Sequence, residues 1–490
     1  MQAGALVIHI ATMDFTKKIP ICLAIPAFLI IALLSGIRPC YSQIKPGDDS
    51  VTCIASSKYK HPGIFLRIAL GNNYRKEWGQ TVIAPLFDIT KEQGGLTITK
   101  EGGGHQTKGL KMISADSTEW ALRSIDKSVE KFIPKLFKHS FIERTAQYMI
   151  SASHPYACLS VSELAKAAGV MTPDPKLVYL PNDTSLGTYR KKFADDLYFF
   201  EQRHPLLPHT RPENMEDLLE RLQKDNREII LQREMLKARL LDMITGDWDR
   251  HQGQWRWGKY DSLGITWYYP IPTDRDQAFF RGKGVMIKLV SLFAIPFLKG
   301  FKKNINELYQ LNKTARNLDR TFLNELTYSD WEKIAIELNN NLTDSVIMAA
   351  INKLPKEIPQ YRKERIGNIL RNRRDGLRGA GIKYYKRLSK KVYVFGSEKV
   401  EYFEIKNINN DLQVTVYNSP TKCDSCKIYQ RTFNRKQTRL IYLVSIRGDD
   451  KLILPTGKTN IRIRKILPVN DGKYDLRRKM LERLRAKGQA

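Results

Sequence analysis

The sequence lacks the periodicities of fibrous and repeat proteins. Its 490 residues show no Gly-X-Y period, no heptad array and no short internal repeat, which excludes collagen-like, coiled-coil and solenoid architectures. Only one apolar run has the length of a membrane-spanning segment, so a polytopic membrane protein is excluded. With 42% hydrophobic and 10% aromatic residues, the chain can bury a sizeable core, and its length suggests about two to four domains.

Cysteine is scarce, with six residues in the whole chain. The pair Cys423 and Cys426 forms a lone CxxC between two alternating runs, which places it in a hairpin loop. Zinc would need a second ligand pair at a matching spacing, and none follows. A thioredoxin-type site would need a strand-to-helix context, which is also absent. The pair is therefore interpreted as a local disulfide or as plain loop cysteines.

The single apolar run predicts an export signal. Lys17 and Lys18 precede Ile19–Ile37, and the small residue Ser42 offers cleavage before Gln43. An uncleaved N-terminal anchor is the alternative interpretation.

Acidic residues are few relative to basic ones: 51 Asp and Glu face 81 Lys and Arg, for a net charge of +30. A field this positive favours anionic partners such as nucleic acid, phosphorylated glycolipid, acidic lipid headgroups or a phosphate-bearing substrate. No zinc finger, RNA-recognition module or other nucleic-acid motif is visible. Together with the export signal, this makes nucleic acid a minor hypothesis.

Hydrophobic periodicity predicts an α+β chain in which short strands come first, helices follow, and strands return after about residue 390. The expected divisions are 1–42 signal peptide with an upstream extension, 43–70 irregular segment, 71–180 β-rich lobe with a glycine-rich loop, 181–390 helical lobe, 391–470 β-domain and 471–490 basic tail.

A glycine-rich turn between two predicted strands is the first candidate element of a functional site. Backbone N–H groups of glycines can approach phosphate oxygens closely, and nearby side chains can add donors. The turn contributes the candidate nucleotide-binding residues Gly102, Gly103, Gly104, Gln106 and Thr107. The next strand ends in cations, and Arg123 could pair with the phosphates of a nucleotide. Taken alone, a structural hairpin turn and an exposed strand end are the simpler interpretations.

Two acidic turns indicate a functional site more specifically than the glycine-rich turn does. Thr245–Gln254 follows a predicted buried helix, Gln232–Thr245, and crowds carboxylates, a histidine and amides into one turn. Asp249 could accept a proton from a hydroxyl nucleophile, while Gln254 could hold a divalent ion. The second turn carries Asp274 and Asp276 after the next strand, where a carboxylate could complete an oxygen site for Mg²⁺ or Mn²⁺. A structural helix end is the alternative.

The order GGGHQT, ALRS, GDWDRHQGQ and DRDQAF resembles atypical kinase-like families: the CotH spore-coat kinases, the Golgi-type secretory kinases and the HipA-like kinases. The resemblance implies a bilobal kinase-like domain, with Asp249 and His251 as catalytic residues and Gln254 as a metal ligand. Asp274 or Asp276 would be the second metal ligand. Arg123 stands where these families usually carry a lysine, with Glu143 as its expected acidic partner.

A second resemblance covers roughly residues 74 to 450. The stretches EWGQTVIAPLFDI, GGLTITKEGGGHQTKGLKM, ISASHPYA, GDWDRHQGQWRW and PIPTDRDQAFF are similar to a bacterial envelope module. That module often sits between a calcineurin-like phosphoesterase and an outer-membrane barrel of the surface-antigen type. It implies an exported protein in the periplasm, or on the periplasmic face of the outer membrane, of a Gram-negative-type bacterium.

Together these observations predict an exported kinase-like protein that transfers a phosphoryl group from an ATP-like nucleotide to an acceptor, with Mg²⁺ or Mn²⁺. The alternative is a non-catalytic, pseudo-kinase envelope module that assists an outer-membrane barrel or another envelope protein, or that binds anionic glycolipid.

Overall fold

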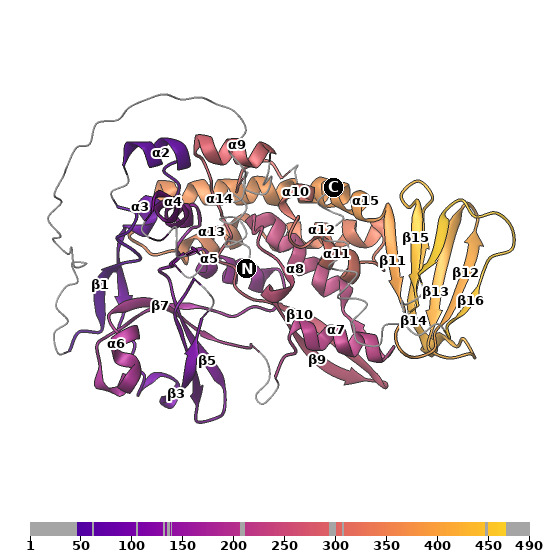
Figure 1. Cartoon of the computed structure of the whole chain (residues 1–490), viewed down its shortest axis with the longest axis horizontal. Helices are drawn as coiled ribbons and strands as arrows, with labels where there is room; N and C mark the ends of the chain where they lie inside the picture. Colours follow the sequence, from indigo (N-terminus) through magenta and orange to yellow (C-terminus); the bar gives the residue numbers. More distant parts are fainter. Residues whose placement is uncertain are drawn as a thin grey trace.

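The computed structural model is a mixed α/β protein that describes residues 47–60, 63–103, 106–130, 133–134, 138, 140–205, 211–293, 300–305, 308–445 and 449–466. The predicted export signal, Gly104 and the basic tail of residues 471–490 lie outside these ranges. Figure 1 shows strands at both ends of an elongated molecule, with most of the helices between them. Within the described ranges, no helix combines the length and apolar character needed to cross a bilayer.

An antiparallel sheet of five strands forms one end of the molecule, in the order β3-β4-β5-β7-β6. Its strands are β3 (Leu96–Gly102), β4 (Gly109–Ser114), β5 (Glu119–Ser124), β6 (Lys176–Leu180) and β7 (Asp196–Gln202). The sheet therefore continues beyond residue 180, where the sequence predicted the β-rich lobe to end. The prediction missed β7 because its central residues are buried on both faces, so the strand lacks the alternation that identifies a half-buried one.

The helices pack mainly in the middle of the molecule (Figure 1). They are α2 (Ile64–Leu70), α3 (Arg75–Trp78), α4 (Phe141–Met149), α5 (Ala157–Ala167), α6 (Arg190–Phe193), α7 (Met215–Lys224), α8 (Gln232–Thr245), α9 (Val285–Phe293), α10 (Leu308–Leu311), α11 (Arg316–Phe322), α12 (Tyr328–Asn341), α13 (Asp344–Asn352), α14 (Gln360–Asp375) and α15 (Leu377–Leu388). Two small sheets accompany them: β1 (Ser50–Ile54) with β2 (Thr81–Pro85), and β8 (Glu228–Ile230) with β10 (Ile265–Pro272) and β9 (Trp255–Ser262).

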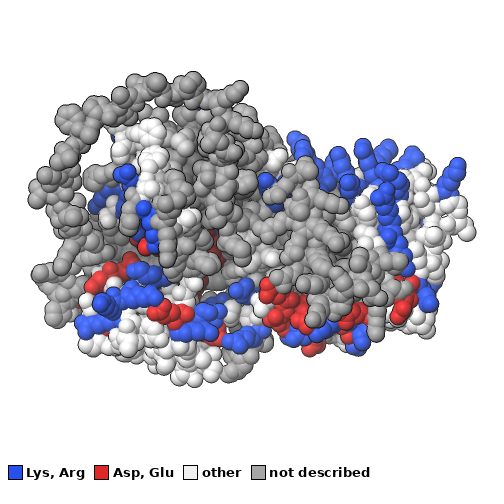
Figure 2. All heavy atoms as spheres, in the orientation of Figure 1, with Lys and Arg blue, Asp and Glu red and all other residues white. Residues whose placement is uncertain are grey.

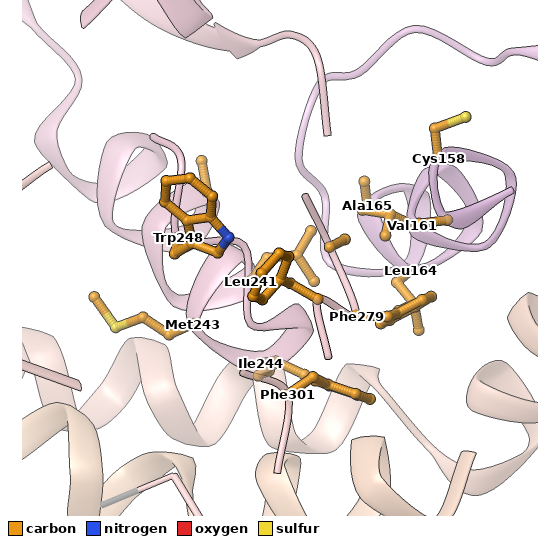
Figure 3. Packing of buried hydrophobic residues seen from close by; sticks show 14 of the residues in the cluster. Cys158, Val161, Leu164, Ala165, Leu241, Met243, Ile244, Trp248, Phe279 and Phe301 are labelled. Atoms are coloured by element: carbon orange, nitrogen blue, oxygen red, sulfur yellow. The ribbon is translucent and has the colours of Figure 1, made fainter. Parts of the chain in front are cut away.

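Helix α8 is the central element of the helical part, and its predicted bounds are confirmed. Its last eight residues, from Ala238 to Thr245, are all buried. Figure 3 shows Leu241 and Ile244 of this helix in the same core as α5 residues such as Leu164, with Phe279 between them. Arg373 of α14 stabilises the end of α8, because its guanidinium donates to the carbonyls of Ile244 at 2.7 Å and Met243 at 2.5 Å. The turn after α8 therefore starts from a rigid support.

The strands after residue 390 form two sheets that contribute to one hydrophobic cluster. One sheet contains β11 (Lys391–Phe395), β15 (Leu440–Val444) and β17 (Arg462–Ile466); the other contains β14 (Lys427–Phe433), β13 (Asp411–Tyr417), β12 (Tyr402–Ile408) and β16 (Lys451–Ile453). Figure 2 shows Lys and Arg side chains gathered along the upper edge of this part, and both signs of charge along the lower edge of the molecule.

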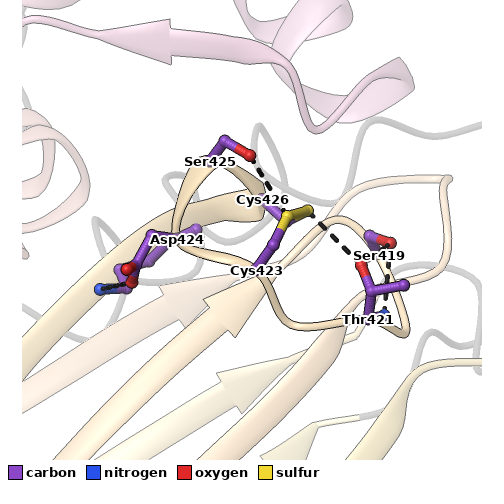
Figure 4. Close-up of a disulfide and its surroundings, with 7 residues drawn as sticks. Ser419, Thr421, Cys423, Asp424, Ser425 and Cys426 are labelled. Atoms are coloured by element: carbon purple, nitrogen blue, oxygen red, sulfur yellow. Dashed lines mark hydrogen bonds and ion pairs between the residues drawn. A yellow bond between two sulfur atoms is a disulfide. The ribbon is translucent and has the colours of Figure 1, made fainter.

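The CxxC lies in the loop between β13 and β14, as predicted, and its cysteines form a disulfide with a Cα–Cα distance of 5.1 Å (Figure 4). The local-disulfide interpretation is therefore confirmed. Cys53 and Cys158 are buried free thiols.

Candidate functional site

The acidic turn after α8 is held by backbone hydrogen bonds. Asp247 N donates to the Asp242 carbonyl at 2.9 Å, and Asp249 N donates to Asp247 Oδ1 at 3.2 Å. Asp247 is buried in this turn, and Asp249 is half-buried. The turn thus presents two carboxylates, two residues apart, at the end of a buried helix.

The second acidic turn lies against the first. Thr273 N donates to the Gln254 carbonyl at 3.0 Å, and Gln254 Nε2 lies 3.4 Å from Asp274 Oδ2. Asp274 has a φ of 55°, and Phe279 has a φ of 60°, a left-handed conformation that is costly for an aromatic residue and is found mainly where surrounding structure imposes it. The two acidic turns therefore contact each other.

A buried arginine–aspartate network joins the two turns. Asp242 Oδ2 accepts from Arg239 at 2.8 Å and from Arg250 at 3.1 Å. Arg275, from the second turn, lies 3.3 Å from Asp242 Oδ1. Arg250 also donates to the Thr273 carbonyl at 2.7 Å. Because Arg250 and Arg275 come from different turns and share one carboxylate, Asp242 fixes the turns relative to each other.

Two cations from the far side of the site contact the second turn. Arg123, in β5, pairs with Asp274 Oδ1 at 2.9 Å and with Glu201 Oε1 of β7 at 3.1 Å. Lys127, just beyond β5, forms a close ion pair with Asp276. Glu201 and Asp274 therefore take the place of the expected partner Glu143, which lies on α4. The reason is geometric: β7 pairs with β5, and Glu201, which lies opposite Ala121, is the diagonal cross-strand neighbour of Arg123 on the same face.

Arg123, Lys127, Asp274 and Asp276 line a small cleft together with Thr107 and His154. Thr107 belongs to the glycine-rich turn, which Gln106 ties to the segment after β5 by accepting from Ser128 N at 3.0 Å. Glycine is required at residue 103, since φ is +99° and a Cβ there would lie 2.4 Å from the Thr107 carbonyl oxygen. The turn therefore reaches the cleft through Thr107.

Burial and like charge set the protonation of the acidic groups. Burial raises the pKa of Asp249 to about 7, and the carboxylates of Asp276 and Asp274 add to this effect, while Arg250 opposes it. Burial also raises the pKa of Asp247 well above its usual range. Burial would raise the pKa of Asp274 too, but Arg123 and Lys127 outweigh it and lower that pKa. The site therefore holds ionised and protonatable carboxylates side by side, as acid–base chemistry requires.

This arrangement predicts a specific dependence of stability on pH. Between about pH 4, where an unfolded aspartate ionises, and about pH 7 the folded protein binds more protons at Asp249 and Asp247 than the unfolded chain. The free energy of unfolding should therefore fall as pH rises through this window. We expect Asp247→Asn to raise the melting temperature by several degrees at pH 8 and by less at pH 5, measured by calorimetry.

The exposed Asp424 provides the matched control, because Asp424→Asn should leave both melting temperatures unchanged. An Asp247→Asn variant that melts below the wild type at pH 8 would show that ionised Asp247 stabilises the fold and would contradict the prediction.

Three buried oxygens of the first turn have no hydrogen-bond partner among the described residues: Asp247 Oδ2, Asp249 Oδ1 and Gln254 Oε1. Asp247 Oδ2 lies 3.9 Å from the Arg250 guanidinium in an ion pair. Carboxylate and amide oxygens are the ligands that Mg²⁺ and Mn²⁺ prefer, so the chemistry of these three oxygens fits such an ion. No cluster of three or more His, Cys, Asp or Glu side chains is close enough to hold a metal within the described ranges. Asp274 and Asp276 are instead paired with Arg123 and Lys127, so recruiting them as ligands would require those ion pairs to open.

Most of the predicted site residues lie together. Asp249, Gln254, Asp274 and Asp276 meet at the two turns, and Arg123 reaches them from the sheet. His251 lies on the same turn, where its Nδ1 accepts from Gly253 N at 3.0 Å.

Sequence reasoning did not place Lys127, Glu201 or the cleft-lining His154 in the site. Lys127 could have been identified from sequence, since it follows Arg123 by four residues at a strand end. Glu201 lies inside a strand that was not predicted, so no sequence pattern identified it as a site residue.

The chain has a low-level structural similarity to a solved protein. No protein-family model matches the chain, and no curated protein matches it. The chain is similar to a solved structure described as the Helicobacter pylori proinflammatory kinase CtkA, with 13% sequence identity and a TM-score of 0.34. The match covers 61% of this chain and 98% of the kinase. A TM-score this low does not establish a shared fold, so the geometry of the site has to support any function proposed for the chain.

Proposed function

We propose that this chain is an exported, kinase-like enzyme that transfers a phosphoryl group from an ATP-like nucleotide to an acceptor, with Mg²⁺ or Mn²⁺. In this proposal the β3–β7 sheet and its glycine-rich turn are one lobe, and the helices from α7 to α15 are the other. The observation that carries the proposal is that the second acidic turn and two cations, Arg123 and Lys127, line one cleft, while the first acidic turn packs against the second.

The cations and the glycine-rich turn have a proposed role in nucleotide binding. Arg123 and Lys127 pair with nucleotide phosphates, and Thr107 covers them together with backbone N–H groups of the turn. Both cations line the cleft with Thr107, so the three side chains can contact one ligand.

The acidic turns have a proposed role in the transfer itself. Asp249 accepts the proton of the acceptor hydroxyl, for which a pKa of about 7 is well matched to neutral pH. Gln254 with Asp274 or Asp276 would hold the divalent ion, which neutralises charge on the transferred group when bound. His251 shapes the first turn in this proposal, because its Nδ1 accepts from the backbone of Gly253.

A second candidate function is a non-catalytic envelope module. It is favoured by one observation: Arg123 and Lys127 neutralise Asp274 and Asp276 directly, so the cleft can be electrostatically satisfied without nucleotide or metal. In this proposal the protein assists an outer-membrane barrel or another envelope protein, or binds anionic glycolipid.

Nucleotide binding separates the two candidates before any acceptor is known. We expect ATP with Mn²⁺ to raise the melting temperature of the purified chain by several degrees, because a ligand that binds only the folded state stabilises it. The Arg123→Gln/Lys127→Gln variant should lose this shift. Its control is Lys259→Gln/Arg256→Gln on β9, which should keep it. A melting temperature indifferent to nucleotide and metal at millimolar concentration would favour the non-catalytic module.

A further inference from the structure

Helices α2 and α9 lie side by side at the upper edge of the molecule and expose large apolar side chains (Figure 1). Exposed fractions reach 75% for Ile64, 63% for Phe65 and 64% for Ile68. We call this surface the apolar face; it consists of Ile64, Phe65 and Ile68 of α2, Phe141 of α4, and Val285 and Leu289 of α9. The rings of Phe65 and Phe141 are 5.9 Å apart, so the face is continuous from α2 to α4.

The apolar face is held in place by close packing beneath it. Gly284, directly before α9, approaches α2 so closely that a Cβ would lie 2.0 Å from the Ala69 carbonyl oxygen. Ala69, Leu70 and Ile287 point inward and are buried. Each helix therefore uses one side for the core and leaves a second apolar side on the surface. Contiguous exposed apolar surface of this kind marks an interaction site in soluble proteins.

A basic groove continues directly from the apolar face. It is an open groove lined by Arg281, Lys283, Lys302, Lys303 and Arg365. Lys283 adjoins Gly284, so the groove begins where α9 begins. Glu364 also lines the groove, but none of the five cations has an ion pair with a carboxylate of the described ranges.

The groove's cations oppose one another. Partial burial lowers the pKa of Lys283, and the positive charges of Arg281, Arg365 and Lys288 lower it further. Burial lowers the pKa of Arg281, and Arg365 adds to this effect, while Tyr74 and Glu77 oppose it. An anion in the groove would relieve this repulsion, which gives the groove a preference for negatively charged ligands.

We propose that the apolar face and the basic groove together dock this protein on a membrane surface that carries anionic, phosphate-bearing lipid headgroups. The apolar side chains enter the boundary between headgroups and acyl chains, and the groove binds headgroup phosphates. Apolar residues beside a cluster of cations are the pattern of interfacial membrane binding. Charge complementarity selects this occupant over a neutral protein surface. The proposal does not depend on phosphoryl transfer.

The test uses the full chain, so that the N-terminal apolar run is the same in every variant. We measure partitioning onto vesicles of phosphatidylcholine with phosphatidylglycerol, and onto vesicles of phosphatidylcholine alone. Phe65→Ser/Ile68→Ser should weaken partitioning onto the anionic vesicles by about tenfold or more. Lys283→Gln/Lys302→Gln should weaken it by about 30-fold, since each cation near an anionic leaflet contributes about fivefold. Tyr260→Ser/Leu263→Ser, in the exposed tip of the β9–β10 hairpin, is the matched control.

A fluorophore reports the orientation independently of affinity. An environment-sensitive label at Ile68→Cys, in a Cys22→Ser/Cys40→Ser background, should shift to the blue with anionic vesicles, whereas a label at Leu263→Cys should not. Cys53 and Cys158 are buried and do not compete for the label.

Three results would overturn the proposal. Equal partitioning of all variants would assign membrane binding to the N-terminal run. A blue shift at Ile68→Cys without vesicles that grows with protein concentration would assign the face to a second copy of the chain. A shift without vesicles at any concentration would mean that the chain covers the face itself.

Discussion

Asp249→Asn should reduce phosphoryl transfer by about 10²- to 10⁴-fold, the usual contribution of a positioned general base. Asparagine keeps the shape of the side chain but cannot accept the acceptor's proton. In the wild type, the rate should rise between pH 6 and pH 8, because Asp249 must ionise and its pKa is about 7. Incorporation of label from γ-labelled nucleotide with Mn²⁺, measured across this pH range, tests both expectations.

The matched control for this experiment is Asp261→Asn, at an exposed aspartate on the β9–β10 hairpin, which should transfer at the wild-type rate. If Asp249→Asn retains full activity while Asp247→Asn loses it, the proton acceptor is Asp247. If no variant and no condition gives incorporation, while nucleotide still fails to stabilise the chain, the non-catalytic module is the better description.

The largest effect on stability is expected at Asp242. This carboxylate is completely buried and pairs with Arg239, Arg250 and Arg275, which are themselves buried. Asp242→Ala would leave buried guanidinium groups without their shared counter-charge, and breaking a buried ion pair from one side costs about 3–5 kcal/mol. Denaturant unfolding followed by circular dichroism should show this decrease.

Two comparisons make the Asp242 experiment specific. Glu220→Ala removes the exposed pair with Lys224 and should leave the unfolding midpoint unchanged. Asp242→Asn keeps the volume and some hydrogen bonds, so it should fall between Asp242→Ala and the wild type. If Asp242→Ala unfolds at the wild-type midpoint, the two turns are held together by their backbone contacts alone.

Local sequence patterns were sufficient for several elements. The three-to-four spacing of apolar residues identified α8 with its observed bounds, because helical periodicity survives even when other faces are also buried. Alternating runs identified the strands around the CxxC, because half-buried strands expose every second side chain. By contrast, Ile64–Leu70 received no assignment, since its apolar residues face both the core and the surface as α2.

The sequence predicted which residues belong to the candidate site better than it predicted the partners with which they interact. Asp249, Gln254, Asp274 and Asp276 could be singled out because unusual functional side chains crowd two short turns. The partners of these residues could not be identified from sequence, since an ion pair such as Arg123 with Glu201 joins positions far apart in the chain. Sequence spacing carries no information on which strand lies beside β5.

The sequence by itself determined the mixed α/β character, the positive charge, the loop position of the CxxC and the two acidic turns, because each depends on composition or on neighbours a few residues away. Only the tertiary structure decided that Asp242 joins the turns, that Arg123 and Lys127 hold their carboxylates, and that α2 and α9 form one apolar face. These features depend on contacts between distant segments, and such contacts exist only once the chain has packed.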